Sequence, residues 1–263
     1  MIFMIRLYLR LGGGYDMQIT NAREALEAML SQNEALQALN ITINSRALKS
    51  AEAIGHPERD DFPLLRGKEV LLQAEVEGGV GQAFTADPIA FHGPVKDLLT
   101  IADDRPGTHA LMVASLNALF NKLGKADHTV HCIDHEPEDC AQQISQSIME
   151  KHGRCNIGII GYQPAILDHC VRSFGPDRVR ITDLNADVVG TVRYGVKVMD
   201  GLTDTGILVD FADVLLVTGT ILANGTYLDV LGAVGDKPYY FFGTTCAALA
   251  YLNGMDRLCP FSK

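Results

Sequence analysis

This sequence is short of basic residues and has no long uninterrupted run of apolar ones. Its 263 residues include 22 lysines and arginines against 32 aspartates and glutamates, which gives a formal net charge of -10. Nucleic acids and anionic membrane surfaces bind to basic protein faces, so this charge argues against both as partners. The apolar segment 1–11 is interrupted by Arg6 and Arg10 and is too short to span a bilayer. It also lacks a small-residue cleavage site, so we expect neither a membrane helix nor a secretory signal.

Motifs that identify several common enzyme and metal-binding classes are also missing. The sequence has no Cys-x-x-Cys pair, no Walker loop and no Gly-x-Ser-x-Gly elbow. These absences argue against a zinc finger, a P-loop nucleotide-binding protein and an α/β-hydrolase. The six cysteines are irregularly spaced, and a chain of this length does not need disulfide bonds to be stable. We therefore interpret them as reduced thiols in a cytoplasmic protein.

The length and the 47% apolar content are sufficient for two globular domains. Gly12–Gly14 breaks any regular structure before Met17, so we expect residues 1–16 to be a disordered extension. The charged segment Asp103–Gly107 contains a proline and a glycine and is the best candidate for a domain boundary. We therefore predict a first domain over 17–105 and a second over 106–263.

The two predicted domains have different patterns of secondary structure. The first is α+β, with helices over 21–37 and 95–101 and strands over 39–44, 69–77 and 81–85. The second begins with a helix over 109–123, a polar loop over 131–140 and a helix over 141–150. Strands over 155–160, 179–183, 214–218 and 238–242 then alternate with helices over 164–173, 224–232 and 245–253. This alternation predicts a mostly parallel sheet with helices on both faces and right-handed crossovers.

The predicted strands of the second domain end in residues that are suited to binding a small polar molecule. Ligands of parallel α/β sheets bind outside the carboxyl ends of the strands. Gly158-Ile-Ile-Gly161 resembles the start of a dinucleotide-binding turn but lacks the third glycine, and Asp183 follows at the spacing of a ribose-binding acid. Alternatively, the glycine serves a tight turn and Asp183 caps the segment after it. NAD is therefore not expected as a cofactor.

Hydroxyl and amide side chains gather at two further strand ends. Thr218-Gly219-Thr220 and Asn224-Gly-Thr226 follow one strand, and Gly243-Thr244-Thr245 follows the next. They predict polar contacts to a ligand, although such residues also act simply as helix caps. In the first domain, three glycines within 78–81 suggest close approach of another group to the backbone, or a plain β-turn.

The segment 131–140 carries the densest set of metal-binding side chains in the sequence. His131, Cys132, Glu136 and Cys140 offer an imidazole, two thiols and a carboxylate, which are the usual ligands of zinc and similar metals. A second interpretation is an acidic loop with one buried cysteine, in which residues 136–139 form the negatively charged first turn of a helix. We retain both interpretations.

A set of motifs in the same order along the chain resembles the heavy-metal chelation domain family, whose function is unknown, together with the small domain that precedes it. The resemblance covers nearly everything after Met17. It rests on the segments Gly81–Thr85, Ser115–Ala118, His131–Ala141, Gly161–Pro164, Thr182–Asn185, Thr218–Thr226 and Arg257–Pro260. It implies an enolase-N-terminal-like domain, then a Rossmann-like domain, with a cleft between them and a role in binding heavy metals.

We therefore expect a protein that holds a metal ion, or a metal-bearing small molecule, in the interdomain cleft. The expected cofactor is a divalent transition metal held by His131, Cys132, Glu136 and Cys140. The expected ligand-binding residues are Gln82, Thr85, Asn117, Gly161, Gln163, Asp183, Thr218, Gly219, Thr220, Asn224, Thr226, Gly243 and Thr244. One alternative is a transferase or lyase acting on an adenosine-like or carboxylate molecule, with His131 as acid or base. Another is a scaffold protein, and a homo-oligomer stays open in each case.

Overall fold

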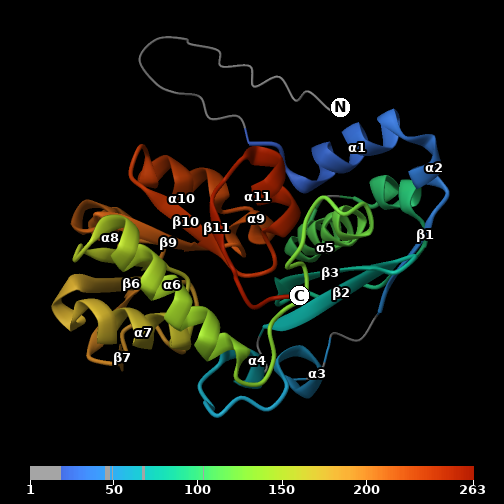
Figure 1. The fold of residues 1–263 in the computed structure, drawn as a ribbon. Helices are drawn as coiled ribbons and strands as arrows, with labels where there is room; N and C mark the ends of the chain where they lie inside the picture. The colour runs from blue at the N-terminus through green and yellow to red at the C-terminus, as the bar shows by residue number, and fades with distance from the viewer. Residues whose placement is uncertain (1–18, 45–47, 49, 67–68, 103) are drawn as a thin grey trace, which may run out of the picture.

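The structure, a computed structural model, describes residues 19–44, 48, 50–66, 69–102 and 104–263, and the predicted extension over 1–16 lies outside them. It contains a four-stranded antiparallel sheet and a seven-stranded, mostly parallel sheet that is flanked by helices (Figure 1). This confirms the predicted fold class of a small α+β part followed by a larger parallel one. All six cysteines are free and buried. None of the helices in the described ranges combines the length and the apolar character that crossing a membrane requires.

The small sheet has the strand order β3-β2-β1-β4. Its strands are β1 (Asn40–Ile43), β2 (Val70–Val76), β3 (Gly79–Thr85) and β4 (Phe91–Pro94). The predicted helix over 21–37 is two helices, α1 (Ala22–Gln32) and α2 (Glu34–Gln37), because the backbone is extended at Asn33. The predicted helix over 95–101 is a 3₁₀ helix, η1 (Val95–Thr100). Between β1 and β2 lie α3 (Ser50–Ile54) and α4 (Pro63–Arg66), which the sequence analysis did not predict.

Helix α5 (Pro106–Lys122) lies directly against β3 and β2. The contact is close because β3 carries glycine at the crossing point. A Cβ atom on Gly81 would lie 2.6 Å from the carbonyl carbon of Asn117 and closer still to the backbone nitrogen of Ala118. The close approach predicted for this glycine-rich segment is therefore confirmed, and the approaching group is the α5 backbone. The domain boundary before residue 106 stays a prediction, and α5 packs on the sheet that precedes it.

The large sheet has the strand order β11-β10-β9-β5-β6-β8-β7, in which only the β7–β8 pair is antiparallel. Its strands are β5 (Ile157–Ile160), β6 (Val179–Asp183), β7 (Val192–Arg193), β8 (Val196–Asp200), β9 (Val214–Thr218), β10 (Tyr239–Phe242) and β11 (Arg257–Leu258). The helices after α5 are α6 (Glu136–His152), α7 (Pro164–Phe174), η2 (Pro176–Arg178), α8 (Thr205–Phe211), α9 (Ile221–Asn224), α10 (Tyr227–Val234) and α11 (Ala247–Asn253).

Several elements of this larger part differ from the prediction. Helix α6 begins at Glu136, so the second half of the predicted loop over 131–140 is helical. Pro137 and the acidic side chains of the first turn favour a helix start at this position. Helices α8, α9 and η2 and strand β11 were not predicted, because all four are short and have no strong periodicity of their own.

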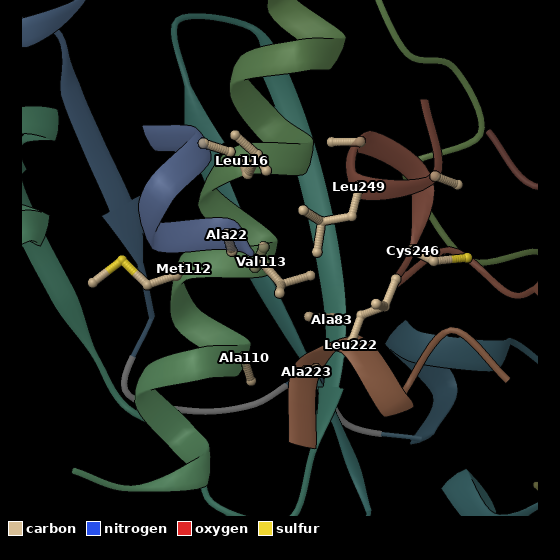
Figure 2. Close-up of a cluster of buried hydrophobic side chains, with 14 of the residues drawn as sticks. Ala22, Ala83, Ala110, Met112, Val113, Leu116, Leu222, Ala223, Cys246 and Leu249 are labelled. Carbon is tan, nitrogen blue, oxygen red and sulfur yellow. The ribbon is translucent and has the colours of Figure 1, made fainter. Parts of the chain in front are cut away.

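Alternation along the strands divides the core into two layers. On β9, Leu215 and Val217 face one cluster of buried side chains, whereas Val214 and Leu216 face the other. The first cluster continues into the small sheet through α5. Figure 2 shows side chains of α1, β3, α5, α9 and α11 meeting in it. The two sheets therefore share one apolar core. This close packing fixes the position of one sheet relative to the other.

Candidate functional site

A pocket of about 100 Å³ lies at the carboxyl edge of the large sheet. From β5 the chain continues to β6 on one side, whereas β9 pairs with β5 on the other side. The connections after β5 and β9 therefore diverge, and such a switch point is the usual ligand site of an open α/β sheet. The pocket wall includes six of the predicted ligand-binding residues, namely Gln163, Thr218, Gly219, Thr220, Gly243 and Thr244.

The other walls come from distant parts of the chain. Phe84 of β3 and Ile54 of α3 face the pocket from the small-sheet side, and so do Phe62, Pro63 and Leu64. The last three belong to residues 55–65, which we call the strap because they cross from the small sheet to the larger part. His131, Cys132 and Cys140 form a further wall. The structure thus brings the predicted thiol and imidazole groups to the same pocket as the turn after β9.

The turn after β5 is held by Asp183, which has a structural task there. Its Oδ2 atom accepts a hydrogen bond from the Tyr162 backbone at 2.6 Å, and its Oδ1 atom accepts one from the Asn185 backbone at 2.7 Å. Gly161 has a φ angle of 97°, and a Cβ atom on it would lie 2.5 Å from Cγ2 of Thr218. Asp183 and Gly161 therefore fix the turn next to the pocket, and neither belongs to the pocket wall formed by the described residues.

Asn117 and Gln82 join the two parts of the protein. The buried Asn117 amide donates to the carbonyl oxygens of Gln82 at 2.9 Å and Thr245 at 3.1 Å, and its oxygen accepts from the Ala248 backbone at 2.9 Å. The Gln82 side chain accepts from the His131 backbone at 2.7 Å. The polar atoms of these two predicted ligand-binding residues form hydrogen bonds within the protein, because a buried amide must be paired.

Four further predicted residues make local hydrogen bonds. The Thr85 hydroxyl accepts from the Asp87 backbone at 3.0 Å. The Asn224 side chain accepts from the backbone and hydroxyl of Thr226 at 3.1 and 2.8 Å. Glu136 accepts from the Ile133 backbone at 2.8 Å. Thr85, Asn224, Thr226 and Glu136 lie outside the pocket wall formed by the described residues.

His131 presents a buried nitrogen atom with no partner. Its Nδ1 atom has no hydrogen-bond partner among the described residues, and the same is true of the Thr244 hydroxyl, which also lines the pocket. Burial lowers the pKa of the His131 imidazole, so the ring is neutral at neutral pH. Buried polar atoms in native proteins are almost always paired, and an unpaired one at a pocket is a common mark of a ligand or water site.

Three thiol groups lie together on the pocket wall. Hydrogen bonding to Cys132, with burial, raises the pKa of the Cys140 thiol to about 12. Hydrogen bonding to Cys140, with burial, raises the pKa of the Cys259 thiol well above its usual value. The thiols of Cys140 and Cys259 are therefore protonated at neutral pH, in which state they are weak metal ligands. Within the described part of the chain, no group of three or more His, Cys, Asp or Glu side chains is arranged to hold a metal ion.

Glu69 is a pocket residue that the sequence analysis missed. It immediately precedes β2 and lines the pocket, where burial and the Asp183 carboxylate raise the pKa of its carboxyl group. A glutamate at a strand start gives no sequence signal for a site, because its position depends on which sheet edges meet. Cys259 belonged to a quoted motif of the resemblance but was not predicted as a site residue.

The strap is attached to the large-sheet part by Arg59. Its guanidinium donates to Glu138 of α6 at 2.7 Å and to Asp168 of α7 at 2.9 Å, and it also contacts the Tyr194 hydroxyl. Tyr194 in turn donates to Asp61 of the strap. The side chain of Arg59 is only 14% exposed. Because Phe62 and Leu64 follow shortly after Arg59, these ion pairs hold one wall of the pocket in place.

Comparison with known proteins supports the fold and leaves the activity open. No protein-family model and no curated protein matches the chain. A solved protein of unknown function from the DUF364 family of Pyrococcus horikoshii has a TM-score of 0.55 and 14% identity, over 89% of this chain and 82% of that chain. A DUF364 protein of unknown function from Desulfitobacterium hafniense has a TM-score of 0.48 and 12% identity, over 69% of this chain and 71% of that one. The first likeness supports the arrangement of the two sheets, and heavy-metal chelation stays a prediction.

Proposed function

We propose that this protein binds a small molecule in the pocket between the small sheet and the carboxyl edge of the large sheet. The observation that carries the proposal is the buried, unpartnered Nδ1 atom of His131 in the pocket wall. An apolar pocket with a few unpaired polar atoms at a switch point of a parallel sheet is the typical form of a ligand site. The nearby Thr244 hydroxyl, which also has no partner among the described residues, supports the same conclusion.

Within this proposal, the predicted metal binding is limited to a metal-bearing small molecule. The described residues offer no group of three metal ligands, so they do not favour a bare ion held by the protein alone. A metal-bearing small molecule needs fewer protein ligands, because the molecule supplies the others. His131 Nδ1 and the Cys132 sulfur are the atoms that would complete its coordination.

A binding screen with paired variants tests the proposal. Protein purified without chelator is screened by thermal shift against zinc, nickel, cobalt and copper salts, S-adenosylmethionine, nucleotides and a library of small apolar amines, alcohols and acids. A ligand of the pocket raises the unfolding temperature of the wild type and of His152→Asn, but not of His131→Asn. His152 is a suitable control because its ring bonds the Tyr240 hydroxyl at 2.9 Å outside the pocket. Binding that survives both His131→Ala and Cys132→Ala would remove the site from this pocket.

A second candidate function is catalysis at the same pocket. Burial lowers the pKa of His131 and raises that of Glu69, so the pocket holds an imidazole and a carboxyl group whose pKa values lie closer together than usual. Groups whose pKa values are shifted in this way are frequent in enzyme active sites. This supports the predicted transferase or lyase as the alternative. Turnover of a bound ligand, lost in both His131→Asn and Glu69→Gln, would distinguish it from a binding protein.

A further inference from the structure

The wall of the pocket carries negative charge and no positive charge. Among the described residues that line it there is no lysine or arginine, and Glu69 is the one acidic side chain. The whole chain has a net charge of -10, so the field outside the pocket has the same sign. A ligand that carries a phosphate or carboxylate would be buried beside Glu69 without a counter-charge from these residues, which is energetically costly.

The unpaired polar atoms of the pocket are suited to accept hydrogen bonds. The buried Nδ1 atom of His131 has no partner among the described residues, and it presents a lone pair when the ring proton is on Nε2. The Thr244 hydroxyl likewise has no partner among the described residues and can also accept a hydrogen bond. Together with the Glu69 carboxylate, they form a set that matches a donor with several N–H groups.

Aromatic rings form much of the remaining wall. Phe62 comes from the strap, Phe84 from β3, Tyr162 from the turn after β5, and Phe242 from the end of β10. Phe84 also packs edge-on against the His131 ring, with their centroids 5.6 Å apart. The face of an aromatic ring carries partial negative charge and attracts cations, and a carboxylate among several rings is a common way of binding an organic ammonium group.

We propose that the ligand of this pocket is a small organic amine that binds as an ammonium ion, with its nitrogen at Glu69 and its apolar body against the aromatic rings. This inference rests on the proposed function and specifies the class of small molecule. The size of the cavity, about 100 Å³, limits the buried part of the ligand. Benzene occupies an apolar cavity of roughly 150 Å³ in another protein, so the part of the ligand that is buried here is at most one ring or a short alkyl chain.

Three probes that share one body and differ in charge test the inference. Benzylamine, benzyl alcohol and benzoate are titrated into the full-length protein by isothermal titration calorimetry. We expect benzylamine to bind at least about tenfold more tightly than benzyl alcohol, and benzoate to bind more weakly than either. In Glu69→Gln the preference for the amine should disappear. Glu75→Gln is the matched control, since Glu75 lies on the exposed face of β2 and bonds Gln73 outside the pocket.

The outcomes separate this inference from the proposed function. If benzyl alcohol or benzoate binds as tightly as benzylamine in a manner that requires His131, the pocket is a ligand site but the ligand is not an ammonium ion. A preference for benzylamine that persists in Glu69→Gln would likewise refute the role of the carboxylate. If no probe binds while an unrelated ligand passes the His131 test above, the inference fails and the proposed function stands.

Discussion

Replacement of Arg59 by methionine should detach the strap from the large-sheet part and open the pocket. The guanidinium joins Glu138 of α6 and Asp168 of α7, and the carboxylate side chains are 18% and 8% exposed. Methionine retains much of the length and apolar stem of arginine but supplies no donor. Both carboxylates would then lose a charged partner at a position where water reaches them poorly.

The expected cost follows from this burial. Removing one partner of a buried ion pair typically costs about 3–5 kcal/mol, and the partial exposure here favours the lower end. For a chain of this length about 3 kcal/mol lowers the unfolding temperature by roughly 6–12 °C. Arg172→Met is the matched control, because Arg172 bonds the same Asp168 at 2.7 Å but its side chain is 67% exposed and lies away from the strap. Its loss should cost about 1 kcal/mol or less.

The assay combines thermal unfolding with alkylation of cysteines by N-ethylmaleimide, followed by mass spectrometry. Cys132, Cys140 and Cys259 line the pocket, whereas Cys170 and Cys246 are fully buried elsewhere. In Arg59→Met the pocket cysteines should be modified faster than in the wild type, while the other two are unchanged. Equal acceleration of all five would indicate global unfolding and refute a local opening. Equal destabilisation by Arg172→Met would refute the assigned importance of the strap contact.

Three further predictions concern Glu69, Gly81 and Asn117. Burial and Asp183 raise the pKa of Glu69 in the folded state, so its contribution to stability is present at low pH and is lost as the pH rises through the folded-state pKa. Glu69→Gln should therefore raise the unfolding temperature at neutral pH, with a gain that shrinks toward pH 4.5, the usual value of the group; a gain independent of pH would contradict this. Gly81→Ala forces a methyl group into the α5 backbone and should cost about 3 kcal/mol or more in urea unfolding, whereas a cost below about 1 kcal/mol would show that α5 moves aside easily. Asn117→Ala leaves the Ala248 backbone N–H without its partner and should cost about 2–4 kcal/mol, with faster amide exchange at Ala248 as the diagnostic signal.

The start of helix α6 shows how far the local sequence predicts the structure. The polar composition of 131–140 suggested a loop with metal ligands, and the alternative placed residues 136–139 in a first helical turn. The structure has a helix start there, with Pro137 in the first turn and Glu136 hydrogen-bonded to the Ile133 backbone. One oxygen of its carboxylate is therefore engaged by a backbone N–H, and Glu136 is not part of the pocket wall formed by the described residues. Proline position and acidic first-turn residues were sufficient signals, because they act within one turn of the chain.

The sequence by itself determined the class of the fold and the strand ends that carry the pocket, since strand alternation, turn glycines and terminal hydroxyl groups are local properties. It could not show that Asp183, Asn117 and Gln82 would spend their polar atoms on internal hydrogen bonds. The sequence also could not show that Glu69 lines the pocket or that Arg59 joins the strap to α6 and α7. The Arg59–Asp168 contact joins residues 109 positions apart. Contacts of that kind depend on how two sheets pack through α5, and only the tertiary structure decides this, because the packing energy is a sum over many distant side chains.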